Sequence, residues 1–337
     1  MPGADSGITP RSIAVSEAGT VYVSQRSPAR ILVFDRAGAF VRSIGRAGEG
    51  PGEYRDPMIG VGHGHLYVHD TQVSRLTLLD TAGQLRWSRK APCCLTMPVQ
   101  VDGDGRAFVR KAEINFEGKD VGEEFLAVDS LGHDVMVLRR PAVPSSRPGA
   151  WVIVDQAASI SVAIPFGPSV LRAVTADGSV LYGLSTEPAL TLARGERRRQ
   201  WRLAPMAPVA VTQKMRDTAI EMLIAQYEQF LPRERLRVAF RPGDVPSQAP
   251  AFLQLVPDRC GGTWVARTDG QADDVVTLDL LDSTGVHRTR VRARGRFQRR
   301  PMFAVGGGRL AAVMEDENGS SIVRVFDLDV TVTGCAR

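Results

Sequence analysis

The chain has 337 residues, of which 43% are hydrophobic and 23% are charged, and it carries a formal net charge of +5. These proportions are those of an ordinary globular protein that can bury a core without metals or crosslinks, which excludes extensive disorder outside the termini. The mild positive charge permits an anionic partner but does not imply one.

Two short phrases return along the chain at a regular interval. The second of them, Asp-x-x-Gly, follows a strand-like run each time, and the spacing from Asp35 to Asp80 is 45 residues. Two sequence phrases that recur together at a similar spacing indicate a repeat architecture. The first phrase is a glycine followed by apolar residues and begins at Gly19, Gly64, Gly105, Gly178, Gly262 and Gly308, whereas the Asp-x-x-Gly phrases begin at Asp35, Asp80, Asp129 and Asp282.

Each repeat contains four short runs rich in Val, Ile, Leu, Tyr and Phe, separated by the Gly and Asp residues that hairpin turns require. A four-stranded unit of ~40 to 50 residues that occurs six times predicts an all-β fold, a six-bladed β-propeller with antiparallel blades. We expect a single domain over residues 1–337. Its blades are expected at about 11–45, 57–90, 98–140, 165–205, 250–295 and 301–335, and its ring is expected to close through a last strand at 329–333 or through a segment near 6–9.

One segment between blades 4 and 5 has the period of a helix. Apolar residues from Met215 to Phe230 fall on one stripe, Thr212 can cap the start, and Pro232 stops the pattern. We therefore expect a helical insertion at 211–231, which would pack on the propeller as a lid or strut, with a partner-binding helix as the alternative.

The junction after the first blade is distinctive. It reads Gly45-Arg-Ala-Gly-Glu-Gly-Pro-Gly-Glu-Tyr-Arg-Asp-Pro57 and resembles the link between blades in NHL-repeat-like six-bladed propellers. Further along, Val211-Thr212, Pro250-Ala-Phe252 and Gly262-Thr-Trp264-Val resemble a bacterial group of six-bladed propellers that has no settled activity.

The resemblance has two implications. Members of the bacterial group are often exported, which implies an extracytoplasmic location here, although we expect no signal peptide in the chain as given because it starts without a basic segment and an apolar core. The wider NHL-like superfamily includes metal-dependent lactonases and a lyase that hold a divalent ion in the central channel. The resemblance therefore leaves an enzyme as the alternative to a binding protein.

The starts of the six inner strands line one face of a propeller, the face built from the links between blades. In this chain they are apolar or carry amides, as at Pro57-Met58, Pro98-Val99-Gln100 and Phe252-Leu253-Gln254. Calcium sites need carboxylate oxygens and zinc sites need imidazole or thiolate. We therefore predict no catalytic residue, no metal ligand and no cofactor, with Ca or Zn expected only if the enzymatic alternative holds.

The ends of the second strands lie on the same face and are more polar. Together they predict a mixed-charge rim around an apolar mouth, which could orient a polar ligand or a protein loop. The alternative interpretation is that these residues are polar only because loop ends are exposed to solvent. The candidates are Arg26, His69, Asp70, Arg110, Glu187, Arg267, Asp269 and Glu315.

Arginine alternates with other residues from Arg288 to Arg296, so on one strand these side chains project from one side. Such a row could bind phosphate, nucleic acid or an acidic protein. Charged residues on an edge strand also prevent another chain from pairing with the open edge of the sheet, which explains the row without a ligand. Aromatic residues that could stack on bases are nearly absent, so we expect no nucleic-acid partner. The same interpretation, a charged edge without a nucleic-acid partner, applies to Arg194, Arg197 to Arg199 and Arg202.

The sequence thus predicts a non-enzymatic binding or scaffold propeller that uses the link face. Its partner is expected to be a protein, peptide or glycan, the chain is expected to be a monomer, and no stretch approaches the ~18 apolar residues of a membrane helix. The alternative is a metal-dependent lactonase, hydrolase or lyase with its site at the channel mouth.

Overall fold

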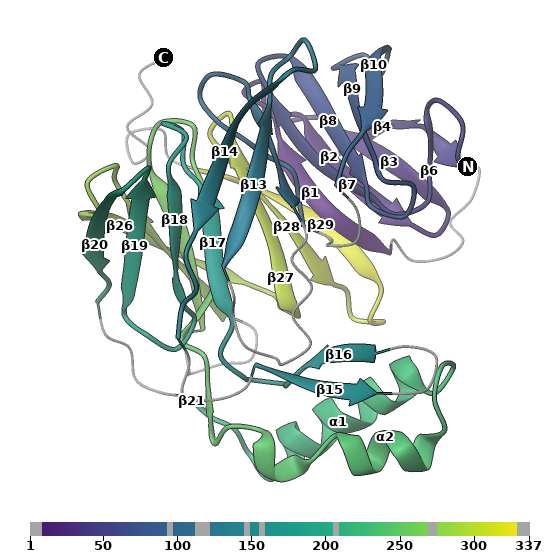
Figure 1. Cartoon of the computed structure of the whole chain (residues 1–337), viewed down its shortest axis with the longest axis vertical. Helices are drawn as coiled ribbons and strands as arrows, with labels where there is room; N and C mark the ends of the chain where they lie inside the picture. Colours follow the sequence, from purple (N-terminus) through teal and green to yellow (C-terminus); the bar gives the residue numbers. More distant parts are fainter. Residues whose placement is uncertain are drawn as a thin grey trace.

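The computed structural model describes residues 9–92, 97–111, 122–144, 149–154, 159–204, 209–268 and 275–328. Its strands form five four-stranded antiparallel sheets and one three-stranded sheet, in which sequence neighbours pair throughout. These six sheets are arranged around a common axis, which confirms the predicted six-bladed β-propeller (Figure 1).

The first three blades follow directly in the sequence, each as a meander of four strands. Blade 1 contains β1 (Pro10–Val15), β2 (Val21–Arg26), β3 (Ala29–Phe34) and β4 (Phe40–Ile44). Blade 2 contains β7 (Pro57–Gly62), β8 (His65–Asp70), β9 (Arg75–Asp80) and β10 (Leu85–Lys90), and blade 3 contains β11 (Gln100–Val101), β12 (Ala107–Lys111), β13 (Glu123–Val128) and β14 (Asp134–Arg140). The link between blades 1 and 2 holds a short parallel pair, β5 (Arg46–Ala47) and β6 (Glu53–Tyr54).

Long links precede and follow blade 4, whereas only Gly295 separates blade 5 from blade 6. Blade 4 contains β17 (Val170–Val174), β18 (Val180–Leu184), β19 (Ala189–Arg194) and β20 (Arg197–Arg202). Blade 5 contains β23 (Phe252–Pro257), β24 (Thr263–Thr268), β25 (Val275–Leu281) and β26 (His287–Arg294), and blade 6 contains β27 (Arg296–Gly306), β28 (Arg309–Glu315) and β29 (Ser321–Asp327). Residues 329–333 and 6–9, which we expected to close the ring, fall outside the described part of the chain except for Thr9.

The Asp-x-x-Gly phrases form the turns between the third and fourth strands of blades 1, 2, 3 and 5. In the first turn the Asp35 carboxylate accepts the backbone N–H groups of Ala37 at 2.8 Å and Ala39 at 2.9 Å. Gly38 has a φ of 86°, a left-handed conformation that glycine adopts without strain. The phrase therefore recurs because the same hairpin is built four times.

A cluster of buried apolar side chains fills each border between neighbouring blades. The border of blades 1 and 2, for example, joins Tyr22 and Val33 to Ile59 and Leu66. The border of blades 6 and 1 joins Ala311 and Val313 to residues of β1, β2 and β3, so the ring is closed by packing. Each blade is too thin to shield both of its faces, and its neighbours provide the missing cover.

The long links on either side of blade 4 fold together into a small cap. Figure 1 shows the cap below the propeller, at the end where the links lie. Its buried residues include Trp151, Ile220, Ile224, Leu236 and Phe240, which form a separate core. It consists of the hairpin β15 (Ala150–Val154) and β16 (Ser159–Ala163), the pair β21 (Val209–Ala210) and β22 (Gln248–Ala249), and the helices α1 (Gln213–Tyr227), α2 (Arg233–Ala239) and η1 (Pro242–Asp244).

The helical region between blades 4 and 5 confirms the predicted insertion. Thr212 caps α1 as expected, with its hydroxyl oxygen accepting the Met215 N–H at 3.2 Å. The predicted helix corresponds to α1, which ends at Tyr227, and a second helix that was not predicted, α2, begins after Pro232. The hairpin β15–β16, which the sequence analysis did not foresee, completes the cap. No helix in the described residues is long and apolar enough to cross a membrane.

Candidate functional site

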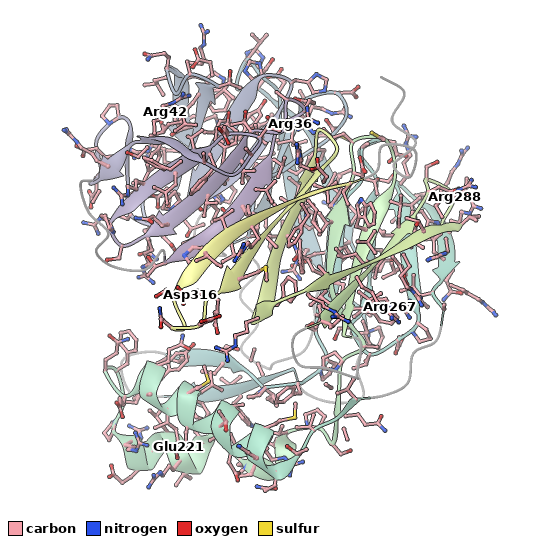
Figure 2. The ribbon with its side chains drawn as sticks, turned by 180° about the vertical axis from the view of Figure 1, so that it is seen from behind. Arg36, Arg42, Glu221, Arg267, Arg288 and Asp316 are labelled. Atoms are coloured by element: carbon pink, nitrogen blue, oxygen red, sulfur yellow. The ribbon has the colours of Figure 1, made fainter. Side chains whose placement is uncertain are left out.

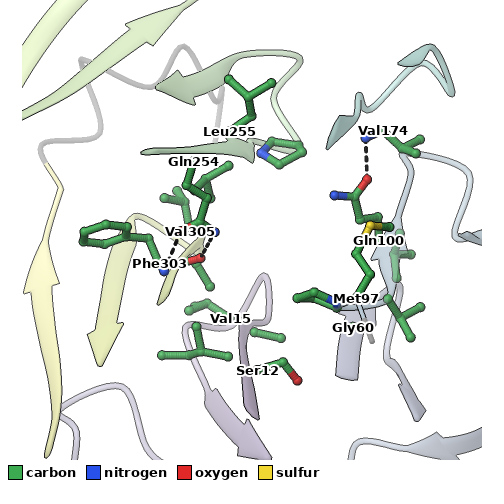
Figure 3. Close-up of a pocket in the computed structure, with 18 of the residues that line it drawn as sticks. Ser12, Val15, Gly60, Met97, Gln100, Val174, Gln254, Leu255, Phe303 and Val305 are labelled. Atoms are coloured by element: carbon green, nitrogen blue, oxygen red, sulfur yellow. Dashed lines mark hydrogen bonds between the residues drawn. The ribbon is translucent and has the colours of Figure 1, made fainter. Parts of the chain in front are cut away.

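The axis of the propeller contains a cavity of about 310 Å³ (Figure 3). All six inner strands line it, because the first strand of each blade faces the axis. Its wall is mainly aliphatic. The apolar lining includes Val15, Ile59, Val61, Val99, Val101, Val174, Leu255 and Val305.

Polar side chains in the wall connect neighbouring inner strands. The Ser12 hydroxyl accepts the Ile59 N–H at 2.8 Å and so joins blade 1 to blade 2. The Gln100 carbonyl accepts the Val174 N–H at 2.5 Å and joins blade 3 to blade 4. These bonds occupy the side-chain oxygens of both residues, and the other polar or charged side chains of the lining are Arg172, Gln254, Asp258 and Arg259.

Gln254 makes the corresponding connection between blades 5 and 6. Its amide donates to the Phe303 carbonyl and accepts the Phe303 N–H, both at 3.3 Å (Figure 3). Together with Ser12 and Gln100, it links every second border around the ring. Sequence reasoning noticed the two glutamines only as amides at strand starts, since nothing local identifies their distant partners.

One end of the channel is crossed by an arginine. Arg259, from the turn that follows β23, forms an ion pair with Glu17 of blade 1 and donates to the Val61 carbonyl of blade 2. The Glu17 carboxylate also accepts the His63 N–H at 3.1 Å. The guanidinium occupies the space that a side chain at Gly62 would need. The channel is therefore obstructed at this end by a contact between three blades.

Burial and hydrogen bonding act in opposite directions on Glu17. Partial burial opposes its charged form, but the His63 N–H and the Arg259 guanidinium outweigh burial and lower the pKa of Glu17. The carboxylate is thus ionised at neutral pH, and its attraction for Arg259 is retained there.

The other end of the channel lies on the link face, where Met97, Pro98, Val170, Leu253 and Phe303 contribute to the lining. The cap is built from links and lies on this side of the propeller (Figure 1). The turn after β28, which carries Asp316, also points toward the cap (Figure 2). The mouth is thus apolar, as expected, and lies beside an accessory element.

Two of the predicted rim residues are buried in blade 2. The His69 ring is 2% exposed and its Nε2 lies 2.8 Å from the Pro92 carbonyl oxygen, while burial lowers the pKa of His69. Asp70 is 1% exposed, and its carboxylate accepts the Arg55 N–H at 2.6 Å and the Asp56 N–H at 3.3 Å. Asp70 thus holds the link between blades 1 and 2, and His69 contacts the link between blades 2 and 3.

Arg110 belongs to a cluster at the border of blades 3 and 4. The buried carboxylate of Glu123 forms ion pairs with Arg110, with Arg140 at 2.7 Å and with Arg172 at 3.2 Å. Arg172 is also part of the channel wall. The sequence analysis named Arg110 but missed Glu123, because the residues meet only after β12, β13, β14 and β17 have assembled.

Arg267 lies at the border of blades 4 and 5 and is 1% exposed. Its guanidinium pairs with Asp279, donates to the Ala204 carbonyl at 2.5 Å, and lies 5.2 Å from the centre of the Phe252 ring. Burial opposes the charge of Asp279, but hydrogen bonds from Arg290 and Arg267 lower its pKa. The cation is thus held inside the protein.

The remaining rim candidates are dispersed. Arg26 ends β2 and Glu187 lies in the turn after β18, and both are exposed. Glu315 ends β28 and is half-buried, and Asp269 lies outside the described residues. The part these eight residues take in ligand binding stays a prediction.

The described histidine, cysteine, aspartate and glutamate residues bear on metal binding and on disulfide bonding. Among the described residues, no group of three His, Cys, Asp or Glu side chains is placed as metal ligands. Cys260 is disulfide-bonded, and Cys93, Cys94 and Cys335 lie outside the described residues.

Solved structures with a similar fold come from several bacteria. A Bacteroides vulgatus member of the DUF4221 family is 11% identical, with 96% of this chain and 95% of that chain covered and a TM-score of 0.53. A Bacteroides fragilis protein described as exported is 10% identical, with 98% and 93% covered and a TM-score of 0.50. A virginiamycin B lyase from Staphylococcus aureus is 10% identical, with 96% and 98% covered and a TM-score of 0.44. At these identities the likeness shows the fold alone.

The sequence itself was also compared with curated proteins and with families. No curated protein matches it. A family model described as a 6-bladed β-propeller, DUF5128, matches residues 9–182, which are 174 of the 337 residues. Because this match covers more than half of its length, the chain belongs to the DUF5128 family of six-bladed β-propellers.

Proposed function

We propose that the protein is a non-enzymatic binding propeller that takes an apolar group of a peptide, protein or glycan ligand into the channel mouth on its link face. The observation that carries this proposal is the aliphatic channel, whose Ser12, Gln100 and Gln254 side chains already make hydrogen bonds between blades. An apolar group gains free energy by leaving water for such a surface.

The size of the cavity supports an anchoring role. Ligand pockets commonly measure ~300 to 1,000 Å³, and the channel, at about 310 Å³, lies at the lower end of that range. It suits one side chain or a small apolar group of a larger partner. The cap and the exposed rim candidates Arg26 and Glu187 would then contact the rest of the ligand.

The proposed location is extracytoplasmic. The disulfide at Cys260 supports it, because disulfides persist mainly in oxidising compartments. The similar Bacteroides fragilis protein is described as exported. Kinship with NHL-repeat propellers is part of the same proposal and rests on the segment 45–57.

The proposal is tested with anilinonaphthalene sulfonate, a dye that fluoresces in apolar sites. Val101 lines the channel, so Val101→Phe fills it, whereas Val41→Phe adds the same ring at an exposed position of β4. We expect saturable dye binding by the wild type and the Val41 variant, and a loss of at least about tenfold in the Val101 variant.

Two results would count against the proposal. Equal dye binding by all three proteins would show that the channel is not the site. Hydrolysis of a simple lactone that depends on added calcium or zinc would instead favour an enzyme.

A further inference from the structure

Arginines are concentrated on the outermost strands of blades 4 and 5. β20 and β26 each carry four, and all of them are exposed. The structure corrects the expectation of a single strand from Arg288 to Arg296, because β26 ends at Arg294 and Arg296 belongs to β27 of blade 6. The eight residues are Arg197, Arg198, Arg199, Arg202, Arg288, Arg290, Arg292 and Arg294.

On β20 the face turned to blade 5 is identified by Trp201. Its indole packs in one cluster with Phe252 and Leu281 of blade 5, and the turn at Gly285 lies against its ring. Because side chains alternate along a strand, Arg197 and Arg199 share this face.

On β26 the face turned to blade 4 is identified by pairing with β25. Arg290 lies opposite Asp279, on the face of β25 that Leu281 shares, whereas Val291 packs with the core toward blade 6. Arg292 and Arg294 follow Arg290 at the same period. The two rows therefore converge on one border, and we call Arg197, Arg199, Arg290, Arg292 and Arg294 the arginine border.

Edge protection alone does not account for this concentration. The outer strands of blades 1 and 3 are edges too, yet they expose large apolar side chains, with Phe40 60%, Val41 51% and Val137 47% exposed. A chain that used charge only to prevent sheet addition would protect those edges in the same way. The arginine border thus differs from the outer strands of blades 1 and 3, whereas β10 of blade 2 carries the cations Arg86, Arg89 and Lys90.

Two of the described carboxylates near the border are already engaged, and a third, Glu196, lies in the turn before Arg197. Asp279 pairs with Arg267 and Arg290, and Asp282 pairs with Arg288. In the part of the chain that the structure describes, Arg199 and Arg294 make no ion pair. Like charges side by side repel one another, so an anion that lies along the border would relieve this cost.

We propose that the arginine border binds an acidic polysaccharide, a linear polymer whose carboxylate or sulfate groups repeat along an unbranched chain. Neighbouring arginines of one row are ~7 Å apart, and each guanidinium can hold an oxyanion with two hydrogen bonds. Single-stranded nucleic acid would need aromatic faces for its bases. Trp201 is buried, and Phe297 packs against Phe303 with ring centres 5.4 Å apart. This site is distinct from the channel and does not depend on the proposed function.

The test measures fluorescence anisotropy of labelled polygalacturonate, with dextran sulfate, neutral dextran and an oligothymidylate of equal charge as competitors. We expect the wild type to bind both acidic polysaccharides, with affinity that falls as salt rises, and to ignore neutral dextran. The double variant Arg199→Gln/Arg294→Gln is expected to bind about tenfold more weakly.

A matched control removes two exposed arginines elsewhere. Arg36→Gln/Arg237→Gln changes the net charge equally, on blade 1 and on α2, and should leave affinity within about twofold of the wild type. An equal loss in the control, an absence of polysaccharide binding, or tighter binding of the oligothymidylate would each overturn the proposal.

Discussion

The aspartate and the glycine of each Asp-x-x-Gly turn have separate physical roles. In the turn of blade 5 the Asp282 carboxylate accepts the Thr284 N–H at 2.8 Å and the Val286 N–H at 3.0 Å, and Gly285 has a φ of 86°. A phrase that satisfies backbone amides and supplies a left-handed residue is needed wherever this hairpin occurs. The positions of these hairpin turns could therefore be predicted from the sequence.

A further Asp-x-x-Gly turn, Asp316 to Gly319 between β28 and β29, was not named in the sequence analysis, and its glycine and Gly285 allow the effect of packing to be separated from the effect of φ. Gly285 faces the Trp201 ring, which a Cβ would overlap, whereas Gly319 has a φ of 79° and nothing near its missing Cβ. We expect Gly319→Ala to lower the free energy of unfolding by about 1 to 2 kcal/mol and Gly285→Ala by about 1 to 3 kcal/mol more. Urea denaturation measures both, and equal losses would contradict the packing at Trp201.

The Asp282 turn also predicts a dependence on pH. Burial opposes the charge of Asp282, but hydrogen bonds from Thr284, Val286 and Arg288 together outweigh it and lower the pKa. A lowered folded-state pKa contributes stability above the unfolded pKa that is lost as pH falls. The urea midpoint of Asp282→Asn should lie below that of the wild type at pH 7, and the gap should narrow below about pH 4. A gap that stays constant from pH 7 to pH 3 would argue against this account.

The side-chain partners in the candidate site were beyond sequence reasoning. Arg110 and Glu123 lie on the neighbouring strands β12 and β13, and Arg172 comes from the next blade, so their cluster depends on the assembled ring. Likewise, Arg267 was expected on the polar rim of the channel mouth, but it is buried beside Phe252. Polarity shows that a residue needs a partner, but only tertiary structure determines which one.

At the scale of elements, the cap has its own core. The Trp151 indole donates to Asp244 at 2.8 Å, and its ring lies 5.0 Å from that of Phe240. The helix α1 was predicted from its apolar stripe and its cap, whereas β15 and β16 were not, because no Asp-x-x-Gly or glycine phrase separates them. Because this turn signal is absent, the hairpin in the link before blade 4 could not be predicted from the sequence.

A matched pair of substitutions tests whether the cap is a separate folding element. Ile224 in the cap and Ile31 in blade 1 are both 0% exposed. Truncation of either to alanine should cost about 2 to 5 kcal/mol locally. In hydrogen exchange, Ile224→Ala should accelerate amides in α1, α2, β15 and β16 only, whereas Ile31→Ala should accelerate amides of the propeller. Faster exchange throughout the molecule in the Ile224 variant would show that cap and propeller unfold together.

At the scale of the whole molecule, the ring is held by apolar borders and by polar contacts near its axis. The apolar borders account for most of the predicted fold, since the repeat and its period follow from the apolar pattern. The contact of Arg259 with Glu17 and Val61 joins blade 5 to blades 1 and 2. Nothing local to Arg259 indicates this role, and the sequence analysis missed it.

A double-mutant cycle measures the coupling between Arg259 and Glu17. We expect Arg259→Gln and Glu17→Gln to be coupled by about 0.5 to 1 kcal/mol at pH 7, a value limited by the partial exposure of both side chains. Because the pKa of Glu17 is lowered, the coupling should fade as pH drops below about 4. A coupling energy near zero at pH 7 would mean that the ion pair between these two residues does not stabilise the propeller.

The central claim is that the channel takes an apolar group of a ligand from the link face. The most direct measurement is the anomalous scattering of bromine in a crystal soaked with a brominated aliphatic alcohol. The account predicts a bromine peak inside the channel, on the link-face side of Arg259 and beside the aliphatic wall formed by residues such as Val101 and Leu255. Bromine found only on the outer surface, with the channel devoid of it, would contradict the account.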